Sequence, residues 1–346
     1  MKVLIIKLSS IGDVIQTLPA LYALRKGFEK KGVKAGGDEP LRIDWLVEEA
    51  SSTVLSGNPL IDNVIIVRNR GWKTHFRENI KTARMLASVH YDMALDFQGL
   101  LKSGVWVWLS KGRRRIGFSN ARELSAVFLN EKAPPYDPDK HAVDRYLDLA
   151  VYAGGEGGEA VFPLYISGEE KNRAQAVLKG GGISDKTPFF VIASRARWRT
   201  KQWNDGAFAE AAKAITEKTG MRAVLVGGLA DRAGLDGLKE RIGKMGVNLA
   251  GHTTLKELAA LMKMSRFVLA VDSGPMHMAS AVGVPVVALF GPTAPRRTGP
   301  YGGKHIIITK ELKCSPCFKK ICPDARCMME ITAQEVVRAV EKMLER

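Results

Sequence analysis

The clearest chemical signal in the sequence is the segment Asp272-Ser273-Gly274-Pro275-Met276-His277. It follows a short apolar run, Val268–Val271, of the kind that forms a buried parallel strand. In open α/β sheets, ligands bind beyond the carboxyl ends of such strands. Gly274 lets backbone approach a ligand closely, and Pro275 in a first helical turn sacrifices no hydrogen bond. We therefore expect a ligand-binding loop, and the helix start behind it favours a phosphate.

Two side chains of this loop have ordinary alternatives. His277 could contact a phosphate, or it could be a structural histidine whose hydrogen bonds are satisfied within the fold. Asp272 could bind a sugar hydroxyl, or it could cap the helix. Position in the sequence leaves both choices open.

A basic loop follows a second apolar run, Phe189–Ala193. The segment from Ser194 to Trp203 carries four cations and two hydroxyls between an expected strand and an expected helix. Backbone N–H groups at the helix start would add to them and make an anion site suited to a pyrophosphate. The alternative is a solvated basic loop. Its tryptophans, Trp198 and Trp203, favour an ordered loop with a function.

A third polar segment, Ser9-Ser10-Ile11-Gly12-Asp13, follows the apolar run Val3–Ile6. Asp13 is expected at the mouth of a sheet, at or near a helix start. A carboxylate is favoured there as a helix cap by geometry and by the helix dipole. The functional alternative is a general base that faces a cleft, and position alone does not choose between the two.

Strands and helices alternate on both sides of a glycine-rich region, which indicates two α/β halves with parallel sheets. We expect two Rossmann-like domains that face each other across a central cleft, residues 1–165 and 166–346. The final helix begins at Thr332, with Glu335 placed for a capping box, and packs in its own half or back on the N-terminal domain. The expected strands are 3–6, 43–47, 64–67, 93–97, 189–193, 223–226, 268–271 and 286–290, and the expected helices are 14–25, 141–153, 205–218, 238–245 and 254–264.

This architecture is shared by nucleotide-sugar transferases and many oxidoreductases, so it does not decide function. The first strand is not followed by G-x-G-x-x-G, and the sequence has no phosphate-binding P-loop and no G-x-S-x-G nucleophile elbow. These absences weigh against a dinucleotide oxidoreductase, a P-loop enzyme and an α/β-hydrolase.

Composition indicates a soluble globular protein, with 46% hydrophobic and 25% charged residues and no secretory signal. No run approaches the ~20 apolar residues that a membrane span needs. The formal net charge of +16 predicts an anionic partner, for which nucleic acid, a nucleotide and an anionic membrane surface all qualify. The densest basic run, Lys111–Arg115, is a solvated loop or a functional patch.

Four cysteines occur within a short C-terminal stretch, at Cys314, Cys317, Cys322 and Cys327. Their spacing could ligate zinc, but it is not one of the strong double C-x-x-C patterns. A cluster of reduced thiols explains the residues equally well, so we assign no metal.

Together these segments resemble the bacterial lipopolysaccharide heptosyltransferases of glycosyltransferase family 9. The opening, residues 8–21, is similar to that of the family, and Asp272–His277 with Leu-Phe-Gly-Pro-Thr at 289–293 is similar to its donor-site signature. Within the family the chain looks most like the heptosyltransferase I branch, through residues 96–103, 121–123 and 141–145.

The resemblance implies a GT-B fold and inverting transfer of L-glycero-D-manno-heptose from ADP-heptose to Kdo of Kdo-lipid A. It implies that Asp13 is the general base and that Lys201 neutralises the pyrophosphate. It further implies that Asp272 contacts the donor sugar. The remaining donor or phosphate contacts are Ser194, Ser273, Gly274 and His277, and the candidate acceptor contacts are Ser10, Gln98, Lys102 and Arg122.

The chain departs from the family in one loop. Some members carry a Glu after the strand that corresponds to 223–226, where it contacts the ribose. Here Asp231 is the candidate nucleoside contact.

The resemblance also implies that no cofactor and no obligatory metal are needed, because fixed cations and amides can stabilise the departing ADP. The expected location is cytoplasmic, peripheral on the anionic inner face of the inner membrane. Alternatives are a family-9 transferase that uses a later core acceptor or another nucleotide sugar and, remotely, a non-enzymatic nucleic-acid-binding protein. The sequence shows no nucleic-acid-binding module, so we expect no nucleic-acid partner.

Overall fold

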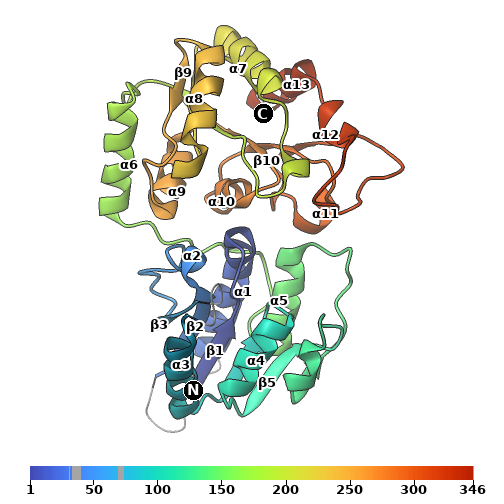
Figure 1. Cartoon of the computed structure of the whole chain (residues 1–346). Coiled ribbons are helices and arrows are strands. Elements are labelled where there is room, and N and C mark those ends of the chain that lie inside the picture. The colour runs from blue at the N-terminus through green and yellow to red at the C-terminus, as the bar shows by residue number, and fades with distance from the viewer. Residues whose placement is uncertain (31, 33–39, 69–73, 346) are drawn as a thin grey trace. The chain divides into compact units, whose positions relative to one another are not determined.

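The computed structural model describes residues 1–30, 32, 40–68 and 74–345. The chain divides into two units, Met1–Tyr165 and Ile166–Arg346, which we call unit 1 and unit 2. Each contains one six-stranded sheet, and every strand pairing in both sheets is parallel (Figure 1). The α/β fold class predicted from the alternation of strands and helices is confirmed.

The sheet of unit 1 has the strand order β3-β2-β1-β4-β5-β6. This is the doubly wound order in which the chain reverses direction across the sheet between the first and fourth strands. The strands are β1 (Lys2–Ile6), β2 (Arg42–Glu48), β3 (Asn63–Val67), β4 (Met93–Asp96), β5 (Arg114–Phe118) and β6 (Glu131–Ala133). The helices are α1 (Ile11–Lys30), α2 (Glu49–Ser52), α3 (Phe76–Val89), α4 (Leu101–Leu109) and α5 (Ala142–Tyr152), with a 3₁₀ turn η1 (Ser125–Phe128).

Helix α1 packs on α5 and on the turn that follows α5. Close approach is possible because Gly27 has no side chain: a Cβ built on it would lie 2.5 Å from the backbone nitrogen of Glu156. The helix is longer at both ends than the predicted 14–25 and continues through Pro19. Its first turn lies directly after β1, which brings Asp13 to the carboxyl end of that strand.

Unit 2 repeats the topology, with the order β9-β8-β7-β10-β11-β12. Its strands are β7 (Phe189–Ala193), β8 (Arg222–Leu225), β9 (Gly246–Asn248), β10 (Val268–Val271), β11 (Val286–Leu289) and β12 (Ile306–Ile308). Its helices are α6 (Gly168–Gly180), α7 (Asp205–Thr219), α8 (Arg232–Ile242), α9 (Leu255–Met264), α10 (Gly274–Ala281), α11 (Pro295–Thr298), α12 (Arg326–Met329) and α13 (Ala333–Leu344), with 3₁₀ turns η2 (Arg199–Lys201) and η3 (Leu229–Asp231).

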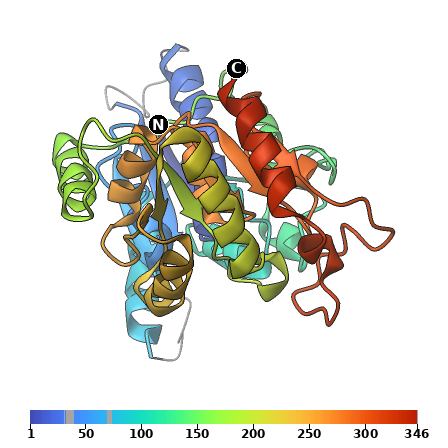
Figure 2. The same ribbon diagram turned by 90° about the horizontal axis from the view of Figure 1, so that it is seen from above.

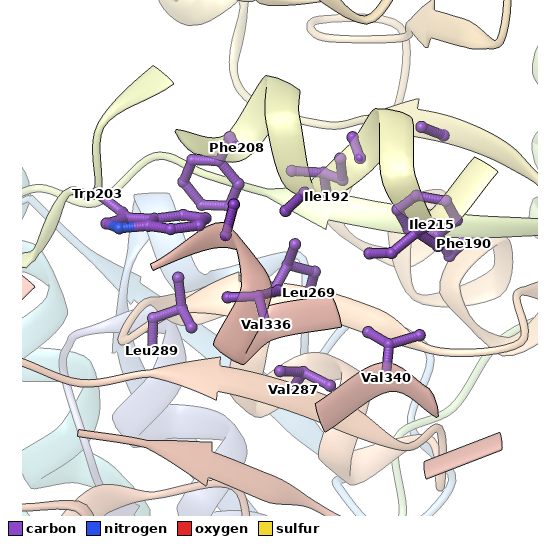
Figure 3. Close-up of a cluster of buried hydrophobic side chains, with 14 of the residues drawn as sticks. Phe190, Ile192, Trp203, Phe208, Ile215, Leu269, Val287, Leu289, Val336 and Val340 are labelled. Atoms are coloured by element: carbon purple, nitrogen blue, oxygen red, sulfur yellow. The ribbon is translucent and has the colours of Figure 1, made fainter. Parts of the chain in front are cut away.

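The final helix, α13, contributes to the core of unit 2 (Figure 2). Its Val336 and Val340 face side chains from α7, β10 and β11, including Phe208 and Leu289 (Figure 3). The predicted capping box begins the helix: the Glu335 N–H donates to Thr332 Oγ1 at 3.3 Å, and the Thr332 N–H donates to Glu335 Oε2 at 2.8 Å. The helix packs against α7, β11 and β12 of unit 2.

Two predictions of local structure need correction. The helix expected at 238–245 is α8, which begins earlier, at Arg232, and ends at Ile242, because Gly243 adopts a positive φ of 85°. The basic run Lys111–Arg115 is not one loop, since its last two residues begin β5. Arg114 pairs with Glu131 at 2.8 Å, and Arg115 Nε donates to the carbonyl of Phe128 at 2.9 Å. Two of the cations in this run therefore make contacts within unit 1. Among the described helices, none has the length and apolar content to cross a membrane.

Candidate active site

Most of the candidate site residues follow the strands at which each sheet reverses its order, whereas Arg122 follows β5 and Asp231 follows β8. In unit 1 the strands at this reversal are β1 and β4, and in unit 2 they are β7 and β10. Ligands of doubly wound folds bind outside the carboxyl ends of strands at this switch point, where the two loops diverge. Most of the positions predicted from the sequence therefore lie where such a fold can hold a ligand.

An ion pair joins the two switch-point loops of unit 2. Lys201, in η2 after β7, lies with its Nζ 2.6 Å from Oδ2 of Asp272, directly after β10. The side chains are 17% and 6% exposed, so the pair is largely removed from water. Lys201 also lies over the ring of Trp198, 4.6 Å from its centroid. The cation is thus held at the carboxyl edge of the sheet.

Thr293 was not predicted as a site residue. Its Oγ1 donates to Asp272 Oδ2 at 2.6 Å, so a cation and a hydroxyl contact the same carboxylate oxygen. Thr293 follows β11, the strand next to β10. The Leu-Phe-Gly-Pro-Thr motif at 289–293 was the available signal, because it ends on this residue.

Two buried hydroxyls in these loops have no hydrogen-bond partner among the described residues. They are Ser194 Oγ, directly after β7, and Ser273 Oγ, at the start of α10. A buried hydroxyl without a partner is costly, so such groups often await a ligand or water. Gly274 and Pro275 open α10, and among the described residues no side-chain hydrogen bond caps this helix start. The buried His277 lies in the next turn.

The cations of the loop from Ser194 to Trp203 divide into two kinds. Arg195 makes a bidentate ion pair with Asp205, with distances of 2.6 and 2.9 Å, so it anchors the start of α7. Arg197 and Arg199 are exposed. Of the four cations in this loop, the largely buried Lys201 is the one that reaches Asp272.

Asp231, the candidate nucleoside contact, lies in η3 after β8. Its Oδ2 accepts a hydrogen bond from the Gly228 N–H at 2.9 Å, which orders the turn before α8. The strand β8 neighbours β7, so the residue lies at the same edge of the sheet as Ser194.

In unit 1, Asp13 lies in the first turn of α1, where its Oδ2 accepts from the Ser10 N–H at 2.9 Å and from the Ser10 hydroxyl at 2.8 Å. Asp13 is the third residue of α1, so its carboxylate binds back to Ser10, the residue before the helix, and is not itself the N-cap. These hydrogen bonds fix the carboxylate beside the exposed Ser10, in the loop after β1.

Gln98 is held by a buried carboxylate at the end of β4. Asp96 Oδ1 accepts from the N–H groups of Gln98 and Gly99 at 2.9 and 3.0 Å, and Oδ2 accepts from the Ser103 hydroxyl at 3.0 Å. Burial raises the pKa of Asp96, and these hydrogen bonds act against that rise. Gln98 Oε1 in turn accepts from the N–H groups of Leu8 and Ser9, both at 3.2 Å. The loops after β1 and β4 are therefore connected.

Lys102 on α4 extends this network. Its Nζ donates to Ser9 Oγ at 2.9 Å and pairs with Glu48 Oε1 at 2.8 Å. Glu48, at the end of β2, was not predicted, because only the strand order brings it near α4. Arg122 lies farther along, with its N–H on the carbonyl of Gly99 at 3.0 Å and its side chain exposed.

A third residue that was not predicted is Lys7, directly after β1. It is 2% exposed, and its Nζ donates to the Phe97 carbonyl at 2.9 Å and to the Tyr146 hydroxyl at 2.6 Å. A lysine that directly continues the apolar run Val3–Ile6 was the signal for a buried cation. It lies beneath the loops that carry Ser10 and Gln98.

The four cysteines are reduced, and their loop extends from unit 2 in both ribbon views (Figures 1 and 2). The loop is attached beside Thr293: the Cys317 N–H donates to the Pro292 carbonyl at 3.0 Å, and a Cβ built on Gly291 would lie 3.0 Å from Cys327 Sγ. Burial raises the pKa of Cys327. Within the described ranges, no group of three or more His, Cys, Asp or Glu side chains is arranged to hold a metal ion.

Comparison with known proteins shows the family to which the chain belongs. The family model described as "Glycosyltransferase family 9 (heptosyltransferase)" matches residues 79–327. The chain is 30% identical to lipopolysaccharide heptosyltransferase 1 of Pseudomonas aeruginosa over 336 residues, which cover 93% of this chain and 87% of the relative. It is also 30% identical to lipopolysaccharide heptosyltransferase 1 of Salmonella typhimurium, over 91% of this chain and 95% of the relative.

The fold agrees as well. The solved structure of the E. coli heptosyltransferase WaaC with ADP has a TM-score of 0.77 and 25% identity, covering 99% of this chain and 100% of that one. Two Rossmann-type units of this topology define the GT-B class of glycosyltransferases. The chain belongs to glycosyltransferase family 9, the heptosyltransferase family, and is most like its heptosyltransferase 1 members.

Proposed function

We propose that this glycosyltransferase moves L-glycero-D-manno-heptose from ADP-heptose to Kdo of Kdo-lipid A during synthesis of the lipopolysaccharide core. The relatives named heptosyltransferase 1 support this donor and acceptor. The observation that carries the proposal is the group of buried polar atoms at the switch point of unit 2. It combines the cation of Lys201 with the unpartnered hydroxyls of Ser194 and Ser273.

The donor diphosphate is proposed to bind at this group. An α-helix start offers free N–H groups and a favourable dipole to an anion, and α10 begins with Gly274 and Pro275 at this edge. The hydroxyls of Ser194 and Ser273 would gain phosphate acceptors, and Lys201 would neutralise part of the charge that develops on ADP as it leaves. His277, farther along α10, would contact the phosphates. Asp272 would accept a hydrogen bond from a hydroxyl of the donor sugar.

Asp13 is proposed as the general base. Its carboxylate takes the proton of the acceptor hydroxyl while that oxygen bonds to the anomeric carbon. The bond from this carbon to the phosphate oxygen breaks at the same time, and its electron pair leaves with ADP. Attack from the face opposite the leaving group inverts the anomeric centre. Proton transfer by a positioned group contributes roughly 10²–10⁴-fold in rate. No metal is required in this scheme, because fixed cations and amides stabilise the leaving group.

The acceptor is proposed to bind in unit 1, near Ser10, Gln98, Lys102 and Arg122. Lys102 and Arg122 are cations, which suits an acceptor rich in carboxylate and phosphate groups. We propose that the protein is cytoplasmic and binds peripherally to the inner face of the inner membrane. A net charge of +16 supports this location, because that membrane face is anionic. Nucleic acid is not a proposed partner.

The experiment that tests the proposal measures ADP release with ADP-heptose and Kdo-lipid A. The wild-type chain should release ADP only when both substrates are present. Asp13→Ala should abolish turnover while it leaves the Kd of ADP-heptose within a few-fold, because Asp13 belongs to a different unit from the donor residues. Near-wild-type turnover in Asp13→Ala would remove Asp13 from the mechanism.

A donor panel of ADP-, UDP- and GDP-sugars separates this proposal from a family-9 transferase with another donor. Selective thermal stabilisation by ADP-heptose is expected. Release of ADP with a later core acceptor but not with Kdo-lipid A would instead favour a heptosyltransferase that acts later in the core.

A further inference from the structure

Unit 1 exposes a group of large apolar side chains beside the candidate acceptor residues. Three lie on α4, where Leu101 is 48% exposed, Val105 37% and Trp108 57%. Two lie on the segment that follows Arg122, where Leu124 is 78% exposed and Val127 69%. Scattered exposed apolar residues are ordinary, but a contiguous group marks an interaction surface.

The three residues on α4 share one face of the helix, because they are spaced by four and three positions. Gly104 lies next to this stripe, and η1 packs against it: a Cβ built on Gly104 would lie 2.6 Å from Phe128 Cδ2. The absence of a side chain at Gly104 thus brings η1 directly alongside the apolar stripe.

The segment 122–128 is attached to α4 along its length. The Arg122 N–H donates to the Gly99 carbonyl at 3.0 Å, just before α4 begins. Glu123 Oε2 accepts from the Leu101 N–H at 3.2 Å. With the contact at Gly104, these bonds hold Leu124 and Val127 beside the stripe. We call the five side chains Leu101, Val105, Trp108, Leu124 and Val127 the α4 face.

Cations border the α4 face at both ends of the helix. Arg122 is exposed at the N-terminal end, and Lys111 and Arg113 are exposed just beyond the C-terminal end. In the part of the chain that the structure describes, no carboxylate pairs with any of these three side chains. An apolar face bordered by unpaired cations matches a surface that offers hydrocarbon together with negative charge.

We propose that the α4 face docks on the surface of an anionic phospholipid bilayer. Trp108 favours a bilayer over a purely apolar partner, since tryptophan prefers the boundary between headgroups and hydrocarbon. Flanking lysine and arginine side chains are drawn to anionic headgroups. The face is continuous with the acceptor residues, because Lys102 follows Leu101 on the same helix. This inference rests on the proposed function, in which the acceptor is lipid-anchored, and it names the surface that meets the membrane.

Flotation of the full chain with vesicles tests the proposal. The wild-type protein should bind phosphatidylglycerol–phosphatidylethanolamine vesicles and should bind pure phosphatidylcholine vesicles much more weakly. Leu124→Asp should reduce binding about tenfold, since it places a charge in the apolar contact. The matched control is Ile321→Asp, at a side chain that is 88% exposed in unit 2. It should bind like the wild type, and thermal unfolding should show that both variants fold.

Activity separates this inference from the proposed function. Leu124→Asp should lose rate on Kdo-lipid A in vesicles but keep the wild-type rate on a water-soluble Kdo acceptor without acyl chains. If the protein binds vesicles but transfers heptose to neither acceptor, the proposed function is refuted, and the proposal that the α4 face docks on a bilayer is retained. Unchanged vesicle binding of Leu124→Asp would overturn the inference. So would a concentration-dependent dimer that the same substitution abolishes, because the face would then be covered by a second copy of the chain.

Discussion

Lys201 Nζ lies 2.6 Å from Asp272 Oδ2, which ties the loop after β7 to the loop after β10. Both side chains are largely buried, so each charge is neutralised mainly by the other. Removal of one partner from a buried pair is strongly destabilising, whereas the net contribution of the intact pair is small. The pair therefore places a cation at the donor edge of unit 2 before a donor arrives.

Lys201→Gln should weaken ADP binding by about 10- to 100-fold, the size of a lost hydrogen bond to a charged group. Isothermal titration calorimetry with ADP measures the change directly. Arg199→Gln is the matched control, because it removes an exposed cation from the same turn. Equal weakening by both variants would indicate that general charge, and not the position of Lys201, attracts the nucleotide.

Thr293→Val should lower the free energy of unfolding by about 2 kcal/mol, because it removes one hydrogen bond to a buried carboxylate. It should also weaken binding of ADP-heptose more than binding of ADP, since Asp272 is proposed to face the sugar. Urea unfolding and calorimetry give the two quantities. Thr253→Val, at a threonine on another loop of unit 2, should change neither. A loss of affinity that is the same for both ligands would contradict the role given to Asp272.

Lys102→Met should raise the KM for Kdo-lipid A and leave the Kd of ADP-heptose unchanged. The substitution removes a cation from the proposed acceptor side and leaves Glu48 without its 2.8 Å partner. Steady-state kinetics at saturating donor measures the change. Lys81→Met, at an exposed position on α3, serves as the control. A fall in kcat with an unchanged KM would instead indicate that Lys102 acts on the reaction step.

His305 should make the stability of unit 2 depend on pH. Burial lowers the pKa of His305 below its ordinary value, and Nδ1 accepts from the Val286 N–H at 3.1 Å, which requires an unprotonated Nδ1. The folded state thus binds the proton less readily than the unfolded chain. Stability from this residue is complete above the unfolded pKa of about 6.5 and is lost as the pH falls from there toward the folded pKa.

Urea unfolding between about pH 7.5 and 5 checks this window. Wild-type stability should fall more steeply with acid than that of His305→Gln, which cannot titrate. Parallel curves for the two proteins would show that protonation of His305 does not matter for folding.

Eight of the twelve described strands followed from short apolar runs, because parallel strands are buried on both faces, whereas β5, β6, β9 and β12 were not predicted. The capping box at Thr332 followed from residue spacing. The sequence also brought out Lys201 and Asp272 separately. It did not predict their ion pair, because that contact depends on β7 lying next to β10. Local residue types determine which elements form, whereas strand order determines which of their ends meet.

The dependence of contacts on the fold also explains why the partners of Arg195 and Lys102 were not predicted. Arg195 resembles an anion ligand when the sequence is read along its loop, and only the fold shows that Asp205 neutralises it. Lys102 was predicted without Glu48, which lies on β2, two strands away from β4. Thr293 ends the motif at 289–293 but was not predicted as a site residue, because its partner Asp272 follows β10 and the contact depends on β10 lying next to β11.

The docking of α13 on unit 2 bears on how the chain is made. Val336, Val340 and Met343 fill the core that Phe208 and Leu289 also share, so this core cannot close until residues 333–344 have been synthesised. Unit 1 has its whole sheet within the first 165 residues and can fold while the rest is still being translated. During that interval the α7 surface that α13 later covers is open to water. In ribosome-bound chains stalled before α13, unit 2 should therefore need a chaperone to cover its exposed apolar surface, whereas unit 1 should not.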